Sequence, residues 1–168
     1  EILNEFNPPT MKEGMLIVDG LFGTGINRPL GGGFAALVKL INQSEAEVVS
    51  IDIPSGLMAE DNSNNIRSNI VCANITLTLH QPKLSFFFPE YQKFLGEIKV
   101  LDIQLSAEGQ RKIPTNYWTL EEYDMRKLMK ERNPFAHKGN MGNALIAAGS
   151  YGMGGAAVLA AKACMRSG

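Results

Sequence analysis

Short apolar runs alternate with polar segments along the first two thirds of the chain. Four of these runs have the length and the branched side chains of buried strands: residues 15–19, 47–53, 73–79 and 97–103. After the first run, apolar residues recur at helical spacing at Phe34, Leu37, Val38 and Ile41, which predicts an amphipathic helix. The alternation of strands and helix favours a parallel α/β sheet buried on both faces.

The last third of the chain has a different pattern. Thr119 and Glu122 fit a capping box and predict a helix that runs to about Glu131. Further on, residues 143–149 predict a strand and residues 154–167 an Ala-rich helix. Because one strand and two helices cannot make an independent core, we expect the chain to be an excerpt from a longer protein.

Composition excludes several classes of protein. The chain has 168 residues, 45% of them hydrophobic and 20% charged, which argues against disorder. A formal net charge of −1 gives no support to nucleic-acid binding through bulk charge. No apolar run reaches the roughly 18 residues of a membrane span, and Cys72 and Cys164 cannot form a disulfide framework. We therefore expect a soluble, cytoplasmic protein with no nucleic-acid or membrane partner.

The charge is unevenly distributed between two parts of the chain. Residues 1–110 carry seven Lys and Arg against thirteen Asp and Glu, a net of −6. Residues 111–168 carry nine against four, a net of +5. This asymmetry predicts two units, 1–110 and 111–168, joined near the polar stretch 106–116. Residues 60–69 are polar and predict a surface loop.

Residues 20–33 form a Gly-rich segment between the first strand, which ends in Asp19, and the helix. Its six glycines would let backbone amides approach an anion, and Arg28 could add a contact to phosphate. The glycine spacing matches neither the dinucleotide fingerprint nor the P-loop. A plain connection between strand and helix fits these residues equally well.

The sequence SIDIPSG at residues 50–56 is a second candidate segment. Asp52 follows a buried strand, at the end of a parallel sheet where ligands bind, and could act as acid or base or bind ribose hydroxyls. The alternative is structural: Asp52 forms the turn and Ser55 caps loop amides.

The remaining candidates carry weaker signals. Gly152, Gly154 and Ala157 match G-x-G-x-x-A, which suggests a Rossmann oxidoreductase, but the expected acid would lie beyond the end of the sequence. We interpret His80 as a satisfied structural histidine, and no His/Cys set has zinc-ligand spacing. The triple phenylalanine at 86–88 favours a core or an interface.

Taken together, the motifs resemble two known families. Residues 18–42, 48–57 and 73–90 resemble the NAD(P)HX epimerase family in order and spacing. Residues 137–168 resemble the opening of the ADP/ATP-dependent NAD(P)HX dehydratase family. The two families occur fused in bifunctional bacterial repair enzymes.

The resemblance implies a fold and an activity. The fold would be a Rossmann-like three-layer αβα sheet, followed by the first strand and helix of a ribokinase-like α/β domain. Residues 1–110 would be the C-terminal portion of the epimerase domain, and residues 111–168 a linker and the truncated dehydratase start. The epimerase, an isomerase, interconverts the R and S forms of NADHX and NADPHX. The dehydratase, a lyase, removes water from the S form with ADP or ATP.

The resemblance also implies site residues and cofactors. Asp19 and Ser55 would be potassium ligands, and Asp52 would contact the nucleotide near the reacting ring as the acid–base residue. Ala156 would contact substrate on the dehydratase side. The substrate phosphates would lie along Gly23, Thr24, Gly25, Ile26, Asn27, Arg28 and Pro29. Potassium and ADP or ATP are the implied cofactors, and magnesium is a further candidate.

Two departures from the families limit the expected activity of this chain. The Asn-Asn-Gly-Gly-Asp-Gly-type motif of the epimerase family, which supplies an Asn to potassium, is absent from the sequence. The catalytic Asp of the dehydratase family and its nucleotide site are absent too. We therefore expect the parent enzyme, a homo-oligomer, to be active and this chain alone to be weak or inactive. The alternative is a non-catalytic, epimerase-like binding or dimerisation module.

Overall fold

The chain divides into two compact units. The computed structural model describes residues 9–129 and 133–167, and the units are Glu1–Pro114 and Thr115–Gly168. The division falls inside the polar stretch 106–116, where the charge balance changes sign.

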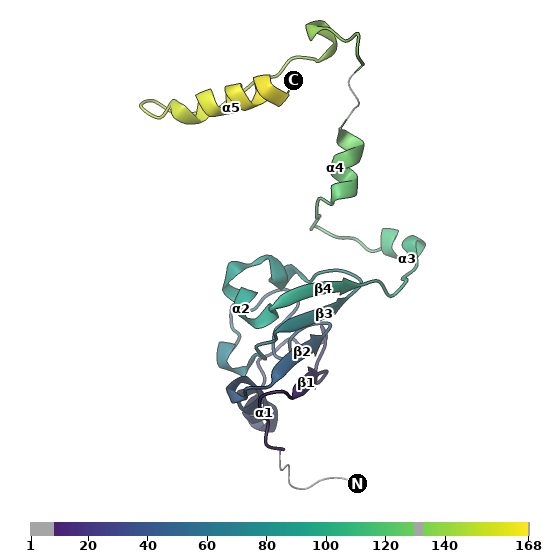
Figure 1. The fold of residues 1–168 in the computed structure, drawn as a ribbon, viewed down its shortest axis with the longest axis vertical. Coiled ribbons are helices and arrows are strands. Elements are labelled where there is room, and N and C mark those ends of the chain that lie inside the picture. The colour runs from purple at the N-terminus through teal and green to yellow at the C-terminus, as the bar shows by residue number, and fades with distance from the viewer. Residues whose placement is uncertain (1–8, 130–132, 168) are drawn as a thin grey trace. The chain divides into compact units, whose positions relative to one another are not determined.

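The first unit is built on a sheet of four parallel strands in the order β1-β2-β3-β4 (Figure 1). The strands are β1 (Leu16–Asp19), β2 (Glu47–Ile51), β3 (Ile75–Leu79) and β4 (Glu97–Leu101). All four correspond to the predicted runs, so the prediction of a parallel α/β sheet is confirmed. The second run stops at Ile51, two residues before its predicted end, because the backbone turns sharply at Asp52, where φ is +68°.

Helices connect the strands. The α-helices are α1 (Gly32–Gln43), α2 (Gln92–Leu95) and α3 (Ala107–Arg111), and the 3-10 turns are η1 (Arg67–Asn69), η2 (Leu84–Phe87) and η3 (Pro89–Tyr91). The predicted helix is α1, but its buried residues are Ala35, Val38 and Ile41. Phe34 is half exposed instead, and its ring meets that of Phe22 edge-on at a centroid distance of 4.9 Å.

Both α1 and α2 contact the same face of the sheet. Val48 of β2 packs in one hydrophobic cluster with Val38 and Ile41 of α1. On the neighbouring strand, Thr76 lies on that same face and donates a hydrogen bond to the Leu95 carbonyl of α2. A second cluster on this side joins the segment after β2 to α2: Ile53, Leu57, Ile70, Phe86, Tyr91, Phe94 and Leu95.

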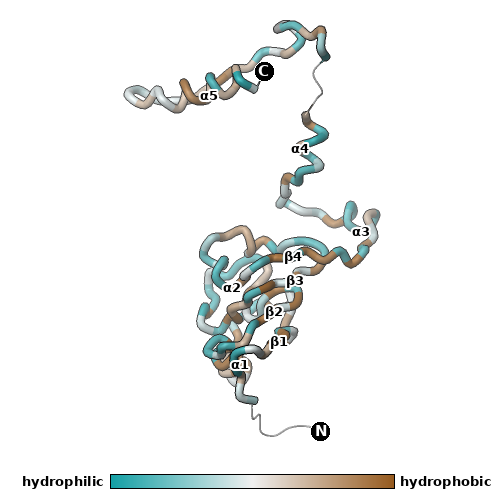
Figure 2. The backbone as a smooth tube through the Cα atoms, viewed as in Figure 1, coloured by the Kyte–Doolittle hydropathy of each residue, from teal (hydrophilic) through white to brown (hydrophobic). Residues whose placement is uncertain are grey.

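The opposite face of the sheet is not covered by the described residues. Leu16 and Val18 of β1 point to it, and Val18 is 62% exposed. Its partner across the strands, Val49, is only partly buried, as is Ile75 of β3. Figure 2 shows that hydrophobic residues nevertheless continue along β3 and β4. The described residues therefore form two layers and not the expected three.

The second unit consists of α4 (Glu122–Leu128), η4 (Lys138–Asn140) and α5 (Gly155–Ser167), and none of its described residues is buried. The helix predicted at residues 154–167 is confirmed as α5. The capping box of α4 joins Glu121 and Asp124, two residues later than predicted, and the predicted helix end at Glu131 lies outside the described residues.

The strand predicted at residues 143–149 is absent from the described structure. Only an isolated bridge between Ser150 and Met153 follows it. A strand needs a neighbour to satisfy its backbone groups, and this unit offers none in its described part. The ribokinase-like domain stays a prediction. None of the helices in the described residues combines the length and the apolar character that crossing a membrane requires.

Candidate active site

Ionisable side chains gather where the four strands end. Asp19 is the last residue of β1, and Asp52, His80 and Asp102 directly follow β2, β3 and β4. Because the strands are parallel, these four positions lie along one edge of the sheet. Open α/β sheets bind ligands outside this carboxyl edge, so it is the first place to look for a site.

Asp19 is 2% exposed and lies at the centre of a hydrogen-bond network. Its Oδ2 accepts hydrogen bonds from Ser50 Oγ at 2.7 Å and from the Ser55 backbone N–H at 2.8 Å. Its Oδ1 accepts a bond from Ser55 Oγ at 2.6 Å, and Ser55 Oγ accepts one from the Phe22 N–H at 3.0 Å. The structure thus brings together Asp19 and Ser55, which the sequence analysis had paired through the family resemblance alone.

The turn that carries Ser55 depends on the glycine after it. Gly56 has a φ of +95°, and a Cβ at this position would lie 2.2 Å from the carbonyl oxygen of Asn69. A side chain cannot be accommodated there without moving the backbone. The Ser55 carbonyl also accepts a hydrogen bond from Val71 N–H, which fixes the turn against the next segment.

Asp52 presents one oxygen to the protein and one to the Gly-rich segment. Its Oδ1 lies 2.7 Å from Lys83 Nζ and accepts a hydrogen bond from Leu79 N–H at 3.2 Å. Its Oδ2 has no hydrogen-bond partner in residues 9–129 or 133–167, and a Cβ on Gly23 would lie 3.6 Å from it. One carboxylate oxygen is therefore available beside the backbone of the predicted phosphate-binding segment.

Lys83 is a site residue that the sequence analysis missed. Its side chain is 12% exposed, and Nζ donates to the carbonyls of Leu79 and Gln81, each at 3.0 Å, in addition to pairing with Asp52. An ammonium group has three protons, so all three are used. Lys83 lies four residues after the end of β3. Only the turn of the chain at His80 brings its side chain to Asp52.

The predicted phosphate-binding segment lines a pocket of about 470 Å³, within the usual size of ligand sites. Its lining comes from residues of two segments: Thr24, Ile26, Asn27, Arg28 and Pro29 from the first, and Met58, Ala59, Glu60, Asp61 and Asn64 from the second. The second segment lies partly in the predicted surface loop 60–69 and was not expected to line a site. Hydrogen bonds from the hydroxyl and the backbone N–H of Ser63 lower the pKa of the Asp61 carboxyl, so an anionic group lines the pocket together with Arg28.

His80 differs from its interpretation as a satisfied structural histidine. Its Nδ1 is buried and makes no hydrogen bond within the described parts of the chain. The nearest carboxylate oxygen, Asp102 Oδ1, is 4.0 Å away, which is beyond hydrogen-bond distance. A buried ring nitrogen at the ligand-binding edge of the sheet is therefore left without a partner.

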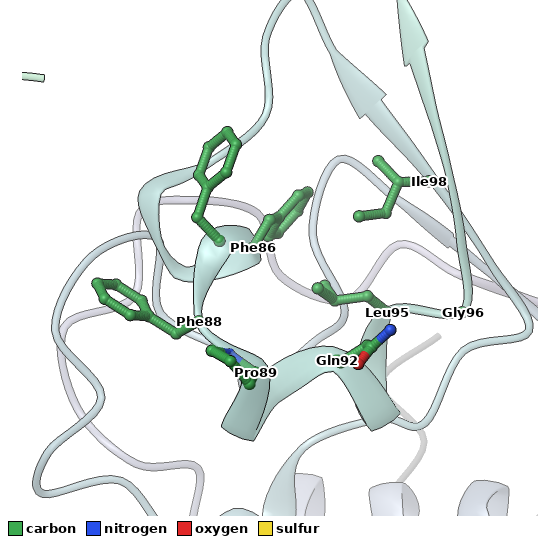
Figure 3. Close-up of a pocket in the computed structure, with 8 residues that line it drawn as sticks. Phe86, Phe88, Pro89, Gln92, Leu95, Gly96 and Ile98 are labelled. Atoms are coloured by element: carbon green, nitrogen blue, oxygen red, sulfur yellow. The ribbon is translucent and has the colours of Figure 1, made fainter. Parts of the chain in front are cut away.

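The triple phenylalanine lines a separate apolar pocket of about 320 Å³ between α2 and β4 (Figure 3). Phe86 is buried, whereas Phe87 and Phe88 are largely exposed. Leu95 and Ile98 complete its apolar wall, and no titratable side chain lines it. It lacks the groups that acid–base chemistry requires.

Other predicted residues lie elsewhere. Ala156 is an exposed residue near the start of α5 in the second unit. The cysteines Cys72 and Cys164 are both free, and burial raises the pKa of the Cys72 thiol. No group of three or more His, Cys, Asp or Glu side chains in the described residues could hold a metal ion.

Known proteins are similar to this chain over most of its length. Residues 2–85 match the family model described as YjeF-related protein N-terminus. A protein of Coxiella burnetii named "Bifunctional NAD(P)H-hydrate repair enzyme Nnr" is 34% identical over 163 residues, which is 97% of this chain and 33% of the relative. The protein of the same name in Vibrio cholerae is 31% identical over 153 residues, 91% of this chain and 31% of the relative.

A third relative matches a smaller part of the chain. The "NAD(P)H-hydrate epimerase" of Limosilactobacillus fermentum is 32% identical over 96 residues, 57% of this chain and 45% of that protein. The chain spans about a third of the length of the bifunctional relatives. The resemblance to NAD(P)HX repair enzymes is thereby confirmed. The family model covers half of the residues and includes every site residue from Asp19 to Lys83, so the chain belongs to the family described as YjeF-related protein N-terminus.

Proposed function

We propose that the first unit carries an epimerase site that interconverts the R and S forms of NADHX and NADPHX. The free Oδ2 of Asp52 beside the Gly23 backbone is the observation that supports this most directly. The names of the relatives point to the same class of substrate.

Each part of the site would have a distinct role. The backbone amides of residues 23–29 and the Arg28 guanidinium would bind the phosphates. Asp52 would take the proton of the hydroxyl on the hydrated ring carbon through Oδ2 while the bond from that carbon to the ring nitrogen breaks, with its electron pair going to nitrogen; the nitrogen would then add back to the other face of the resulting carbonyl, and Asp52 would return the proton to oxygen. The reaction is an isomerisation, so proton uptake and return balance. Lys83, fixed by two carbonyls, would hold Oδ1 and thereby the orientation of the carboxylate.

We further propose that Asp19 and Ser55 hold a potassium ion. The donors at this place are all oxygens: the Asp19 carboxylate, Ser55 Oγ and the Phe22 carbonyl, 3.4 Å from that hydroxyl. Hard cations prefer oxygen ligands, and a single carboxylate suits a monovalent ion. The ion would supply positive charge next to the phosphate-binding segment.

The second unit would contribute to a dehydratase that acts on the S form with ADP or ATP. The relatives named bifunctional extend over 91–97% of this chain, including this unit, and Ala156 at the start of α5 would touch substrate there. We propose that both activities belong to the parent polypeptide, and that this chain alone is weak or inactive as an epimerase because the Asn-containing motif is absent from its sequence.

Chiral chromatography of an unequal R/S mixture of NADHX tests the epimerase proposal. The parent polypeptide should bring the mixture to equilibrium faster in potassium than in sodium, and Asp52→Asn should slow it by at least about 100-fold. Glu97→Gln, on the exposed side of β4, is the matched control and should leave the rate unchanged. If the unaltered parent leaves the R/S ratio as it was, the proposal is wrong. Repeating the assay with NADPHX measures the preference between the two substrates.

A further inference from the structure

Two neighbouring strands end in the same strained turn. Asp52 has a φ of +68°, and Ile53 N–H bonds to the Ile51 carbonyl at 2.9 Å across it. His80 has a φ of +66°, and Gln81 N–H bonds to the Leu79 carbonyl at 2.8 Å. Each is a γ-turn with positive φ, a rare and strained form that concentrates at functional sites.

Lys83 holds both turns in place. Its Nζ bonds to the carbonyls of Leu79 and Gln81, the residues on either side of His80, and to the carboxylate of Asp52. The Leu79 N–H in turn donates to that same carboxylate. His80 and Asp52 are thus linked in two ways. The Lys83 ammonium group bonds to the turn at His80 and to the Asp52 carboxylate, and the N–H of Leu79, the residue before His80, bonds to that carboxylate as well.

The imidazole of His80 has an unmet hydrogen-bonding requirement. Its side chain is 21% exposed, while Nδ1 is buried and has no hydrogen bond among the described residues. Asp102 Oδ1 lies 4.0 Å from Nδ1 and accepts a hydrogen bond from Gln104 N–H at 2.7 Å; the Asp102 side chain is 79% exposed, so rotation of its carboxylate can bring an oxygen closer to Nδ1. Buried polar atoms normally have hydrogen-bond partners, so the unpaired Nδ1 indicates a site that is completed by another group or by a small movement of a neighbouring side chain.

The order of groups along the sheet edge suggests what His80 meets. The phosphate-binding segment follows β1, Asp52 follows β2, His80 follows β3 and Asp102 follows β4. Adjacent strands are about 4.8 Å apart, which places β3 about 10 Å from β1. A nucleotide whose phosphates lie at β1 and whose ring reaches Asp52 would continue toward His80.

We propose that His80 contacts the bound nucleotide by a hydrogen bond to a hydroxyl or carboxamide group of its hydrated ring. Asp102 acts as a positioning residue that closes onto Nδ1 and orients the imidazole. This inference rests on the proposed function and extends its site by two residues on neighbouring strands.

Nuclear magnetic resonance of the two histidines in the full chain tests the contact. With uniform nitrogen-15 labelling, which shows backbone amides and imidazole rings alike, His137→Gln leaves His80 as the single imidazole. Addition of NADHX should shift its ring signals, and Asp102→Asn should reduce that shift at least about twofold. If NADHX moves the amide signals of residues 24–28 and leaves His80 unmoved, this inference fails while the proposed function stands. If no signal moves, both fail.

A pair of glycine variants separates ligand contact from a structural role. His80→Gly removes the imidazole and relieves the positive φ, so the unfolding temperature should rise while the Kd for NADHX increases about 3- to 10-fold. Gln104→Gly, at a φ of +57° after β4, keeps the backbone N–H that donates to Asp102 Oδ1, so it should also raise the unfolding temperature and leave the Kd unchanged. An unchanged Kd in His80→Gly would overturn the inference.

Discussion

At the scale of single residues, Asp19 illustrates how hydrogen bonds hold a buried carboxylate in one orientation. Two hydroxyls and two backbone N–H groups donate to its carboxylate, and two of these four donors come from Ser55. Hydrogen bonds to charged groups contribute more than neutral ones, and leaving such a group partly unsatisfied costs still more. Ser55 therefore supports both the buried carboxylate and the turn that follows β2.

Ser55→Ala should lower the free energy of unfolding by about 1–3 kcal/mol, because it removes one donor to buried Asp19 and the acceptor of Phe22 N–H. Urea unfolding followed by circular dichroism measures the change. Ser63→Ala is the control, since Ser63 also bonds to an aspartate, Asp61, but at the exposed surface. If Ser55→Ala and Ser63→Ala lowered the free energy of unfolding equally, the burial of Asp19 would not explain the loss in Ser55→Ala.

The residues of this site differ in how far sequence alone could reveal them. Asp52 and Ser55 were predicted because a turn after a buried strand has a recognisable composition. Lys83 was missed because its partnership depends on a turn at His80 whose positive φ no local pattern indicates. The pocket wall at residues 58–61 was missed for a related reason, since its position depends on packing between segments far apart in sequence.

At the scale of elements, the sequence predicts where a strand can form better than it predicts whether that strand has a neighbour to pair with. The four runs of branched residues became β1 to β4 because each had a neighbour to pair with. The run at residues 143–149 is apolar but rich in alanine, has no described neighbour and is not a strand. Strand propensity is expressed only within a sheet, which explains both outcomes.

The start of β4 depends on a glycine that no strand pattern predicts. Gly96 has a φ of +59° and a ψ of −143°, and a Cβ there would lie 2.1 Å from the Asn74 carbonyl oxygen. Gly96→Ala should lower the free energy of unfolding by at least about 2 kcal/mol because the conformation is accessible almost only to glycine. Thermal or urea unfolding measures this loss.

Gly25→Ala is the matched control for Gly96→Ala, since nothing lies within 4 Å of a Cβ built on Gly25 and its φ is not positive. It should change the free energy of unfolding by less than about 1 kcal/mol. If the two substitutions had the same effect, the close approach of Gly96 to the Asn74 carbonyl would not limit stability.

At the scale of the whole molecule, the two units differ in burial. The first has two hydrophobic clusters under its sheet, whereas no described residue of the second is buried. Stability is therefore concentrated in the first unit, and local opening of the second costs little free energy. The expected homo-oligomer stays a prediction.

Limited digestion with trypsin should cleave the exposed part of the chain after β4 before it cleaves the buried part of the first unit. Early cuts are expected after exposed residues beyond the sheet, such as Arg111, Arg126 and Lys162, while a fragment that retains β1 to β4 persists. Mass spectrometry of the time course identifies the fragments. Early cleavage after Lys83, whose side chain is held by three acceptors, would contradict the burial described for the first unit.

The uncovered face of the sheet has a thermodynamic consequence. Apolar side chains such as Leu16 and Val18 are already in contact with water in the folded state, so unfolding exposes less new apolar surface than a fully covered sheet would. The heat-capacity increment of unfolding should then fall below the roughly 12–15 cal/mol/K per residue of ordinary domains. A small increment flattens the dependence of stability on temperature, so the chain should show little cold destabilisation for its size, which scanning calorimetry would reveal directly.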